Sequence, residues 1–309
     1  MSMSETNLRK EIEPPERKYK ETVLNKRKEM SYFHIVVKKF LKHRLAVVGL
    51  VVIMIISIIA ILAPFIAPKS PYEIHAVFGS PPSAEHLLGT DQVGRDVFSR
   101  LVYASRVSLL VGLGAVLIYT IIGTILGAVS GYIGGWIDML FMRMTDVFMS
   151  FPNLMVILVI VSVLGPSLLN IILILGLLGW PSVARLVRGS VLSLKEVDFV
   201  KSGIVLGLST PRILFNHIMP NAVAPLLVHA TFGMAAAIII EASLSFLGMG
   251  VQPPIASWGN MLTDAQSITV LSSQPWLWIP PGMMIVISVL AINFVGDGLR
   301  DALDPKTLK

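Results

Sequence analysis

Long apolar runs separated by short polar stretches dominate the chain after residue 44. A helix needs roughly 20 consecutive apolar residues to cross the hydrocarbon core of a bilayer. The runs that reach this length are predicted to be transmembrane helices, and they lie at 45–67, 107–131, 139–164, 168–190, 221–247 and 278–297. The first run is longer than the apolar core of a signal peptide, so we expect it to remain as a helix. The pattern therefore predicts an all-α, polytopic membrane protein with six transmembrane helices.

The segment before the first run shows the pattern of an amphipathic helix. In "YFHIVVKKFLKHRL", Phe33, Val37, Phe40 and Leu41 share one helix face, and the Lys and His side chains lie on the other. This arrangement is typical of a helix lying in the membrane interface. A segment that only anchors the next helix by its positive charge would carry the same lysines. Both interpretations stay open.

Composition supports the membrane assignment and narrows the chemistry. Of the 309 residues, 54% are hydrophobic and 14% are charged, which is far too apolar for a soluble domain of this length. Cysteine is absent, so disulfide frameworks and thiolate metal sites are excluded. The sequence has no G-x-x-x-x-G-K-[ST] phosphate loop, no H-E-x-x-H metal motif and no G-x-S-x-G elbow. We therefore expect no catalytic residue, no metal site and no ATP site in this chain.

Basic residues are unevenly placed, and their distribution predicts the orientation. Residues 1–44 hold 12 Lys and Arg against 6 Glu, which alone equals the net charge of +6. No interleaved aromatic platform accompanies this arm, so nucleic-acid binding is not expected. With both termini in the cytoplasm, 21 of the 25 Lys and Arg lie on the cytoplasmic side, as the positive-inside rule requires. The turn near Gly165 then lies outside.

This orientation divides the chain into five parts. In order, they are a basic cytoplasmic arm with the interfacial helix (1–44), the first transmembrane helix (45–67), an extracytoplasmic loop (68–106), a core of five transmembrane helices with a cytoplasmic segment at 191–220 (107–299), and a cytoplasmic tail (300–309). The outer segment 248–277 is expected to be ordered. Its Trp276 and Trp278 are predicted to lie at the outer membrane interface.

Few ionisable residues fall within the apolar runs. Glu241 lies well inside the fifth run, where a charge costs about 2.5–3.5 kcal/mol on insertion scales, so its side chain must face protein or a cavity. A pathway role and a structural pairing with another helix both fit this position. Arg143 and Asp146 share a helix face, which favours a structural ion pair over a pathway role. His229, isolated in an apolar run, is expected to be a hydrogen-bonded packing residue.

Glycines in the second run predict close helix packing. Gly123, Gly127 and Gly131 in "GTILGAVSG" are spaced by four residues and therefore lie on one helix face. Small residues at this spacing allow two helix backbones in a membrane to approach closely. We expect another transmembrane helix to pack against this face.

The connector between the fourth and fifth runs, "FVKSGIVLGLSTPRILFNHIMPN" at 199–221, is neither a span nor a plain polar loop. Val200, Ile204 and Leu208 recur at every fourth residue and are predicted to line one face of a short helix. Gly203 and Gly207 are expected to allow close approach of a neighbouring backbone. An apolar face on such a helix is suited to docking in a groove of a partner protein.

A second short helix is predicted after the "LSTP" break. Thr210 is a plausible N-cap and Pro211 a favourable first helical residue. Pro220 disfavours a helical conformation at Met219 and is expected to separate this helix from the fifth run. The apolar side of the second helix is expected to consist of Ile213, Leu214 and Ile218. The two helices together would form a compact pair that projects into the cytoplasm.

This connector resembles the cytoplasmic coupling motif of ABC-importer permeases, which runs Glu-Ala-Ala, three residues, Gly, and later Ile-x-Leu-Pro. Gly207 matches the central glycine, and Pro220 falls at the position of the final proline. Lys201-Ser202-Gly203 stands in place of Glu-Ala-Ala, and His217 and Met219 replace the Ile and Leu. The glutamate of the motif therefore has no counterpart in this chain.

Other stretches extend the resemblance over nearly the whole chain from about residue 35. They are "HLLGTDQVGRDVFSRLVYASRVSLLVG" (86–112), "WPSVARLVRGSVLSLKEVDFV" (180–200), "EASLSFLGMGVQPPIASWGNML" (241–262) and "NFVGDGLRDALDP" (293–305). Together they look like the C subunit of dipeptide and oligopeptide permeases. The resemblance implies the type I ABC-importer permease fold in the inner membrane of a bacterium or archaeon.

The resemblance also implies a set of partners. These are a homologous second permease, two ABC ATPase subunits that carry ATP and magnesium, an extracytoplasmic solute-binding protein and the lipid bilayer. Segment 199–219 would fit a cleft in one ATPase subunit and would move as a rigid body when the ATPases close. The residues implied to couple to the ATPase are Val200, Lys201, Ser202, Gly203, Ile204, Gly207, Ser209 and Arg212.

Three other interpretations remain. Nickel–chelate and glutathione importers have similar permeases, so the cargo could differ from a peptide. A proton-coupled secondary transporter would work alone, but such proteins usually carry ionisable or discontinuous-helix sites near the membrane midplane. A membrane enzyme or scaffold is the third. For segment 199–219 itself, a helical linker lying on the bilayer is the alternative to a coupling element.

Overall fold

The computed structural model describes residues 32–304, and within this range the chain is helical apart from its loops and one isolated bridge between Thr90 and Asp96. The elements are α3 (Tyr32–Lys42), α4 (Arg44–Ile61), α5 (Ala63–Ile66), α6 (Val97–Ile133), α7 (Gly135–Met149), α8 (Asn153–Leu164), α9 (Leu168–Lys195), α10 (Asp198–Val205), α11 (Thr210–Ile213), the π-helix η1 (Leu214–Ile218), α12 (Met219–Phe246), α13 (Trp258–Met261), the 3₁₀-helix η2 (Leu262–Gln266), α14 (Ile268–Ser273) and α15 (Pro275–Leu303). The all-α prediction is confirmed. Most of the expected basic arm and the end of the expected tail lie outside the described residues.

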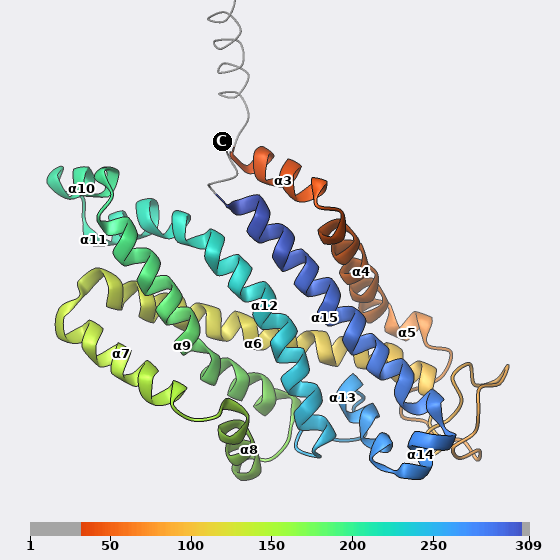
Figure 1. The fold of residues 1–309 in the computed structure, drawn as a ribbon. Helices are drawn as coiled ribbons and strands as arrows, with labels where there is room; N and C mark the ends of the chain where they lie inside the picture. The colour runs from red at the N-terminus through yellow and green to blue at the C-terminus, as the bar shows by residue number, and fades with distance from the viewer. Residues whose placement is uncertain (1–31, 305–309) are drawn as a thin grey trace, which may run out of the picture.

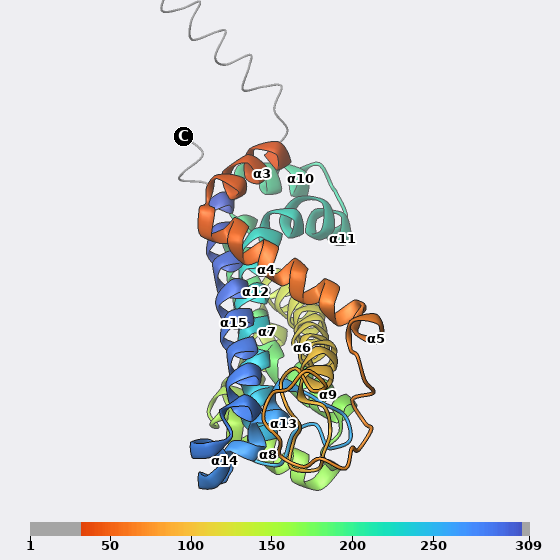
Figure 2. The same ribbon diagram turned by 90° about the vertical axis from the view of Figure 1, so that its right-hand side faces the viewer.

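The helices form an elongated bundle with two different ends (Figure 1 and Figure 2). One end carries α3, α10, α11 and the C-terminal part of α15, and we call it the terminal end. The opposite end carries the 67–96 segment with α13 and α14, and we call it the loop end. The long helices α6, α9, α12 and α15 run between these two ends.

Within the described range, five helices are long and apolar enough to cross a membrane: α4, α6, α9, α15, and α12 with the turns that precede it from Thr210. α7 and α8 pass the same test only as a pair, and they are bent by 84° at a short break. The expected third span at 139–164 is therefore not one straight helix. Pro152 explains the break, because it lacks an N–H donor and disfavours a helical conformation at Phe151. The predicted number of six holds when the bent pair counts as one span.

The second span begins earlier than its apolar run indicated. α6 starts at Val97 rather than at 107, and Asp96 caps it by accepting a hydrogen bond from the Ser99 N–H at 2.8 Å. The first turns of α6 contain buried polar residues, among them Ser99 and Arg100. These polar residues lower the local hydropathy, so the helix start could not be seen as an apolar run. Residues 97–106 of the expected outer loop are thus helical.

α6 and α9 pack at unusually short range along much of their length. A Cβ atom added to Gly127 would lie 2.4 Å from the Ala184 carbonyl oxygen, and one added to Gly123 would lie 2.5 Å from Cβ of Val183. Gly131 meets Val191 in the same way further along. The prediction that these glycines allow close helix approach is confirmed, and α9 is the helix they meet.

The amphipathic segment before the first span is the helix α3, as predicted. His43 ends it and caps α4, because its Nδ1 accepts a hydrogen bond from the Ala46 N–H at 3.1 Å. The Phe40 ring lies against α15 at Gly298, where an added Cβ would also meet the Ala46 side chain. The N-terminal helices are therefore fixed to the C-terminal end of α15 at the terminal end.

The expected break at Pro220 does not occur. α11, η1 and α12 follow one another without an intervening loop, and Pro220 lies in the first turn of α12. The Met219 N–H reaches back five residues to the Leu214 carbonyl, which is the spacing of a π turn. The wider turn before Pro220 lets the helix pass a residue that has no N–H to donate. Thr210 is also not the N-cap, because Ser209 takes that position in extended conformation.

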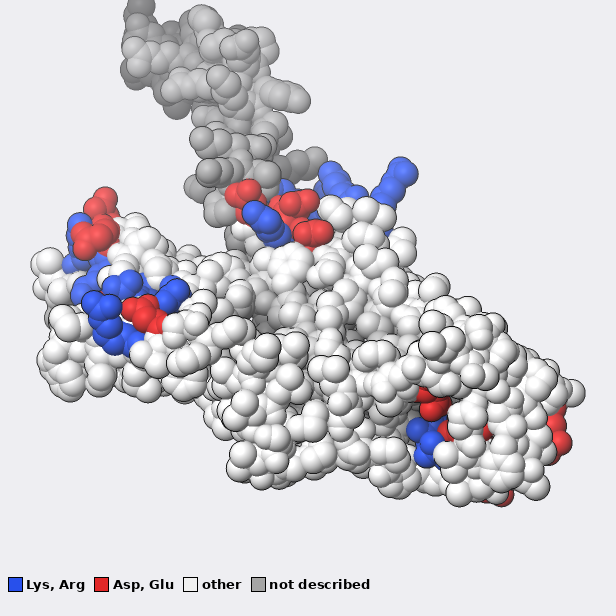
Figure 3. All heavy atoms as spheres, turned by 60° about the horizontal axis from the view of Figure 1, so that its bottom comes forward, with Lys and Arg blue, Asp and Glu red and all other residues white. Residues whose placement is uncertain are grey.

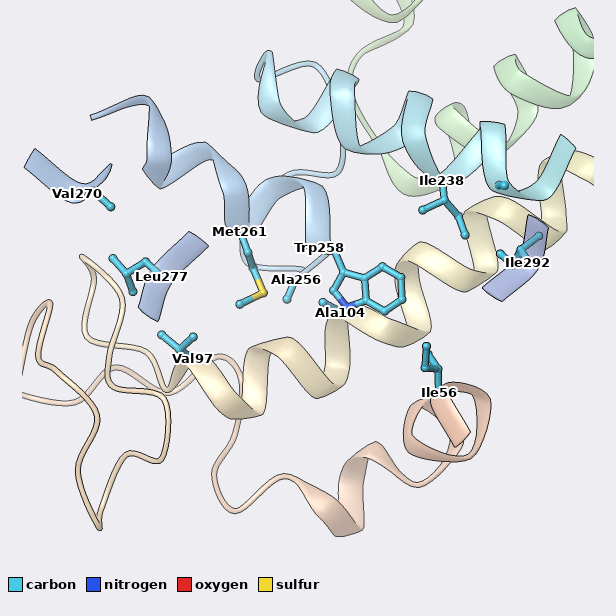
Figure 4. Close-up of a cluster of buried hydrophobic side chains, with 11 residues drawn as sticks. Ile56, Val97, Ala104, Ile238, Ala256, Trp258, Met261, Val270, Leu277 and Ile292 are labelled. Carbon is cyan, nitrogen blue, oxygen red and sulfur yellow. The ribbon is translucent and has the colours of Figure 1, made fainter. Parts of the chain in front are cut away.

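Trp258 is the centre of the core at the loop end (Figure 4). Its fully buried ring comes from α13 and lies among Ala104 of α6, Ile238 of α12 and Ile292 of α15. The 248–277 segment is thus folded onto the spans, and the expectation that it is ordered is confirmed. Ser257 and Asn260 close a capping box at the start of α13.

The contact between α6 and α9 predicts opposite effects for the same substitution on its two helices. Gly127→Ala places a methyl group against the Ala184 backbone, and we expect it to destabilise the protein by about 1–3 kcal/mol. Gly189→Ala on α9 has open space for its methyl group and should be neutral or stabilising by up to about 1 kcal/mol, because alanine favours helix. Thermal unfolding of the purified variants in detergent measures both. Equal stability of the two variants would contradict this account of the packing.

Candidate functional site

The predicted helical pair is present at the terminal end as α10 and α11 (Figure 1). α10 ends in a Schellman motif. The Leu208 N–H donates to the Gly203 carbonyl at 3.1 Å, and the Gly207 N–H donates to the Ile204 carbonyl at 3.0 Å. Gly207 adopts a φ of 74°, which favours glycine at this position of the motif. This turn reverses the chain between α10 and α11.

Gly207 has a different role from the one expected. Nothing lies within 4 Å of an added Cβ atom at this residue, so the glycine does not provide close approach to another part of the described chain. Its positive φ is the constraint, because a side chain there would strain the backbone. Gly203 is buried and touches the Leu208 side chain, which is the apolar contact that often accompanies a Schellman motif.

The apolar faces predicted for docking point mostly into the protein. Val200, Ile213 and Ile218 are fully buried and pack with residues of α6 and α9, including Val187 and Val191. Leu208 and Leu214 lie against the same cluster, and of the predicted set only Ile204 is exposed. The periodicity correctly marked one face of each helix. This face anchors the pair to the spans, so it is not the surface that remains open for a partner.

A different apolar surface is left open on the pair. Val205 is 86% exposed and Leu206 is 80% exposed at the end of α10, and Phe199 at the start of α10 and Phe215 on η1 are also exposed. We call these four residues the apolar tip. Large apolar side chains so exposed in a segment too short to span a membrane indicate an interaction surface.

The polar residues of the predicted coupling set lie around the apolar tip. Lys201 Nζ is 2.9 Å from a carboxylate oxygen of Glu196. The hydrogen bond from Lys201 and its positive charge hold the pKa of the Glu196 carboxyl below its ordinary value. Ser202, Ser209 and Arg212 are exposed.

Glu241 lies on α12 near the loop end and is fully buried, as predicted. Its Oε1 accepts a hydrogen bond from Ser245 Oγ at 2.7 Å, and its Oε2 accepts one from Ser108 Oγ at 3.4 Å. Ser245 lies one turn further along the same helix, but Ser108 is 133 residues away, so no local pattern indicated it.

Ser108 and Ser245 also bind the backbone of the 248–277 segment. Ser108 Oγ accepts from the Trp258 N–H at 3.2 Å, and Ser245 Oγ accepts from the Val251 N–H at 3.2 Å. Each hydroxyl thus accepts from a backbone N–H and donates to Glu241. The carboxyl thereby holds the segment against α6 and α12, which favours the structural interpretation of this residue.

The other ionisable residues singled out in the predicted spans also have partners. Arg143 Nη1 lies 3.6 Å from Asp146, as the spacing predicted, but Asp146 has a shorter contact of 2.5 Å with Arg185 Nη2 on α9. One turn further, Arg188 makes a two-pronged contact with Asp138 at 2.5 and 2.6 Å. These pairs tie α7 to α9. His229 Nε2 lies 3.2 Å from Ser182 Oγ, so the expected hydrogen bond is confirmed.

Comparison with known proteins assigns a family to most of the chain. Residues 123–309 match the family described as binding-protein-dependent transport system inner membrane component. Residues 31–82 match the N-terminal transmembrane domain of oligopeptide transport permease C.

Individual relatives agree with these matches. A dipeptide transport system permease protein of Alkalihalophilus pseudofirmus is 43% identical over 270 residues, covering 87% of this chain and 88% of that protein. One from Bacillus subtilis is 40% identical over 282 residues, covering 91% and 88%. A putative peptide permease protein of Brucella suis is 43% identical over 269 residues, covering 87% and 89%.

The serine contacts of Glu241 predict a graded response to substitution. Glu241→Leu leaves the buried serine hydroxyls without their acceptor, at about 1–3 kcal/mol for each unsatisfied group, and should loosen the 248–277 segment. Glu241→Gln keeps one acceptor oxygen and should be milder. Limited proteolysis of the purified chain within 248–277 measures the loosening. Ser243→Ala is the control, because Ser243 lies on the same helix and hydrogen-bonds only its own turn. Proteolysis of Glu241→Leu at the wild-type rate would contradict the role given to the carboxyl.

Proposed function

The chain belongs to the family of binding-protein-dependent transport system inner membrane components, and we propose that it is the membrane-spanning permease subunit of an ATP-driven importer of dipeptides or oligopeptides. It is a multi-pass membrane protein with the type I ABC permease fold and belongs with the C subunits of peptide permeases. Such permeases are transport subunits and not enzymes. The finer assignment to a peptide cargo rests on relatives whose names specify dipeptide or peptide transport.

The apolar tip is the observation that carries the coupling part of this proposal. It projects at the terminal end, while the buried faces of α10 and η1 join the cluster that lines α6 and α9. A partner that binds the tip would therefore act on a segment packed firmly against two spans. This arrangement supports an ATPase subunit as the partner, with ATP and magnesium bound there and not in this chain.

The remaining partners follow from the same family. We propose that the chain pairs with a homologous second permease to form the translocation path and that an extracytoplasmic solute-binding protein delivers cargo to the loop end. The terminal end would then face the cytoplasm of a bacterium or archaeon. The lysines of α3 and α10 and Arg212 of α11 support this direction, because basic residues concentrate on the cytoplasmic side.

Nickel–chelate and glutathione importers are alternatives for the cargo alone. They would use the same coupling, so uptake assays with each solute distinguish them. A proton-coupled transporter would take up solute without an ATPase subunit, and the test below separates it from the proposed importer.

A charge on the apolar tip should separate the permease from its ATPase. Leu206→Glu puts a carboxylate on a surface proposed to be desolvated in the complex, so we expect at least about a tenfold loss in ATPase co-purification and in ATP-dependent peptide uptake. The residue side chain is 80% exposed, so the isolated chain should remain folded.

Ile268→Glu on α14 is the matched control for this substitution. Ile268 is 83% exposed at the loop end, and its replacement should leave ATPase binding unchanged. Gly207→Trp is a poorer test, since the positive φ of Gly207 confounds docking with backbone strain. Wild-type uptake by Leu206→Glu, or uptake without any ATPase subunit, would contradict the proposal.

The proposed orientation predicts which added cysteines can be labelled. The chain has no cysteine of its own, so single substitutions report one position each. A membrane-impermeant thiol reagent added to intact cells should label Ile268→Cys at the loop end and should leave Ser202→Cys on α10 unlabelled. After the cells are opened, both should react. Labelling of Ser202→Cys from outside would reverse the topology.

A further inference from the structure

A charged cavity of about 370 Å³ lies at the loop end, apart from the helical pair and the Glu241 carboxyl. Figure 3 shows acidic and basic atoms gathered in a hollow of the surface, with further acidic atoms at the nearby edge of the molecule. The 67–96 segment, α6, the loop before α13, and η2 all contribute to its wall. The charged and amide side chains that line it are Asp91, Arg95, Arg100, Gln252, Asn260 and Asp264.

Asp91 and Arg100 are committed to holding the wall together. Asp91 Oδ1 accepts from the Val93 and Arg95 N–H groups, both at 2.9 Å, and Oδ2 accepts from Arg95 Nε at 2.7 Å. Arg100 Nε lies 3.5 Å from the same oxygen. Arg100 Nη1 donates to the carbonyls of Pro71 at 3.4 Å and Pro254 at 3.5 Å. These contacts give residues 91–95 of the "GTDQVGRD" stretch (89–96) a structural role.

Two side chains of opposite charge on the cavity wall, Arg95 and Asp264, can still form hydrogen bonds to a ligand. Arg95 uses Nε for Asp91, and its two Nη atoms make no hydrogen bond to any residue in the range 32–304. The Asp264 carboxyl on η2 likewise accepts no hydrogen bond from the residues that the structure describes. Burial raises the pKa of Asp264, and Asp91 raises it further, while Arg100 and Arg95 lower it. A cationic ligand group beside Asp264 would relieve this cost.

We propose that this cavity binds the charged ends of a short peptide, with Asp264 holding the α-ammonium group and the Nη atoms of Arg95 holding the α-carboxylate. The inference rests on the proposed function and adds a substrate site within the permease itself. A guanidinium presents paired N–H groups that match a carboxylate, and a carboxylate is the complementary acceptor for an ammonium group. The cavity volume falls within the range of about 300–1,000 Å³ typical of small-molecule sites.

The position of the cavity fits an entry site. Ser245 and Gly248, at the end of α12, also line it. Ser245 is one of the two serines that donate to Glu241, so the cavity lies directly beside the segment that Glu241 holds in place. In the proposed orientation this is the extracytoplasmic end, where a peptide leaves the solute-binding protein.

The test is a thermodynamic cycle between ligand ends and wall residues. The full-length chain in lipid nanodiscs is titrated with Ala-Ala, with N-acetyl-Ala-Ala, which lacks the ammonium group, and with Ala-Ala-amide, which lacks the carboxylate. Asp264→Asn should weaken Ala-Ala binding by about tenfold or more. N-acetyl-Ala-Ala should bind wild type and Asp264→Asn alike, because both members of the pair are already lost. Arg95→Lys keeps a cation near Asp91 and should weaken Ala-Ala but not Ala-Ala-amide.

Several outcomes would overturn the site. Additive effects of Asp264→Asn and N-acetylation would show that the two groups do not meet. The site would also be overturned if the wild-type chain failed to bind Ala-Ala at concentrations at which the reconstituted assembly transports it. Glu85→Gln is the control, since Glu85 pairs with Lys69 on the same segment and does not line the cavity. It should bind all three probes as wild type does.

Uptake by the reconstituted assembly separates this inference from the proposed function. An assembly that takes up no peptide with ATP contradicts the proposed function itself. An assembly that takes up Ala-Ala with an unchanged KM in Asp264→Asn contradicts only the cavity site. In a third outcome, Asp264→Asn binds Ala-Ala as wild type does, but the solute-binding protein stimulates its uptake less. This result would show that the cavity receives a basic side chain of the solute-binding protein, and it would also overturn the proposal.

Discussion

The close approach of α6 and α9 is the contact on which the rest of the structure depends. In a membrane the hydrophobic effect does not drive two helices together, because lipid tails are as apolar as their side chains, so close backbone packing has to supply the attraction. Gly123 and Gly127 permit that packing because they have no side chain of their own to separate α6 from Val183 and Ala184. The same surface then receives Val200, Ile213 and Ile218 from the helical pair. A single packed cluster thus joins two spans to the segment proposed to bind the ATPase.

The membrane environment also determines how the polar side chains of the spans are paired. Away from water, a charged side chain has to find its partner within the protein. Arg188 and Arg185 on α9 meet Asp138 and Asp146 on α7, and these contacts fix the bent α7–α8 pair beside the central helices. Glu241 meets serine hydroxyls instead of a cation, and those hydroxyls in turn hold backbone N–H groups of the 248–277 segment. Both arrangements use paired polar groups to position a segment that apolar packing alone would leave free to slide.

Sequence reasoning found the features that depend on local pattern and missed those that depend on distant neighbours. The spans, the glycine face of α6 and the existence of the helical pair follow from length and periodicity. The early start of α6 could not be read from hydropathy, because the polar residues of its first turns are buried by a loop far away in the chain. The inward direction of Val200 and Ile213 was equally invisible, since periodicity identifies an apolar face but not its partner. A proline disfavours helix at the residue before it, but at Pro220 a π turn accommodates the proline, and no sequence pattern predicted that turn.

The continuous helix through Pro220 changes how motion would pass through the proposed importer. With a break at Pro220, the helical pair would be a hinged attachment, and its movement could be absorbed by the hinge. The structure instead joins α11 to α12 through η1 without a loop, and α12 extends to Phe246, beyond Glu241.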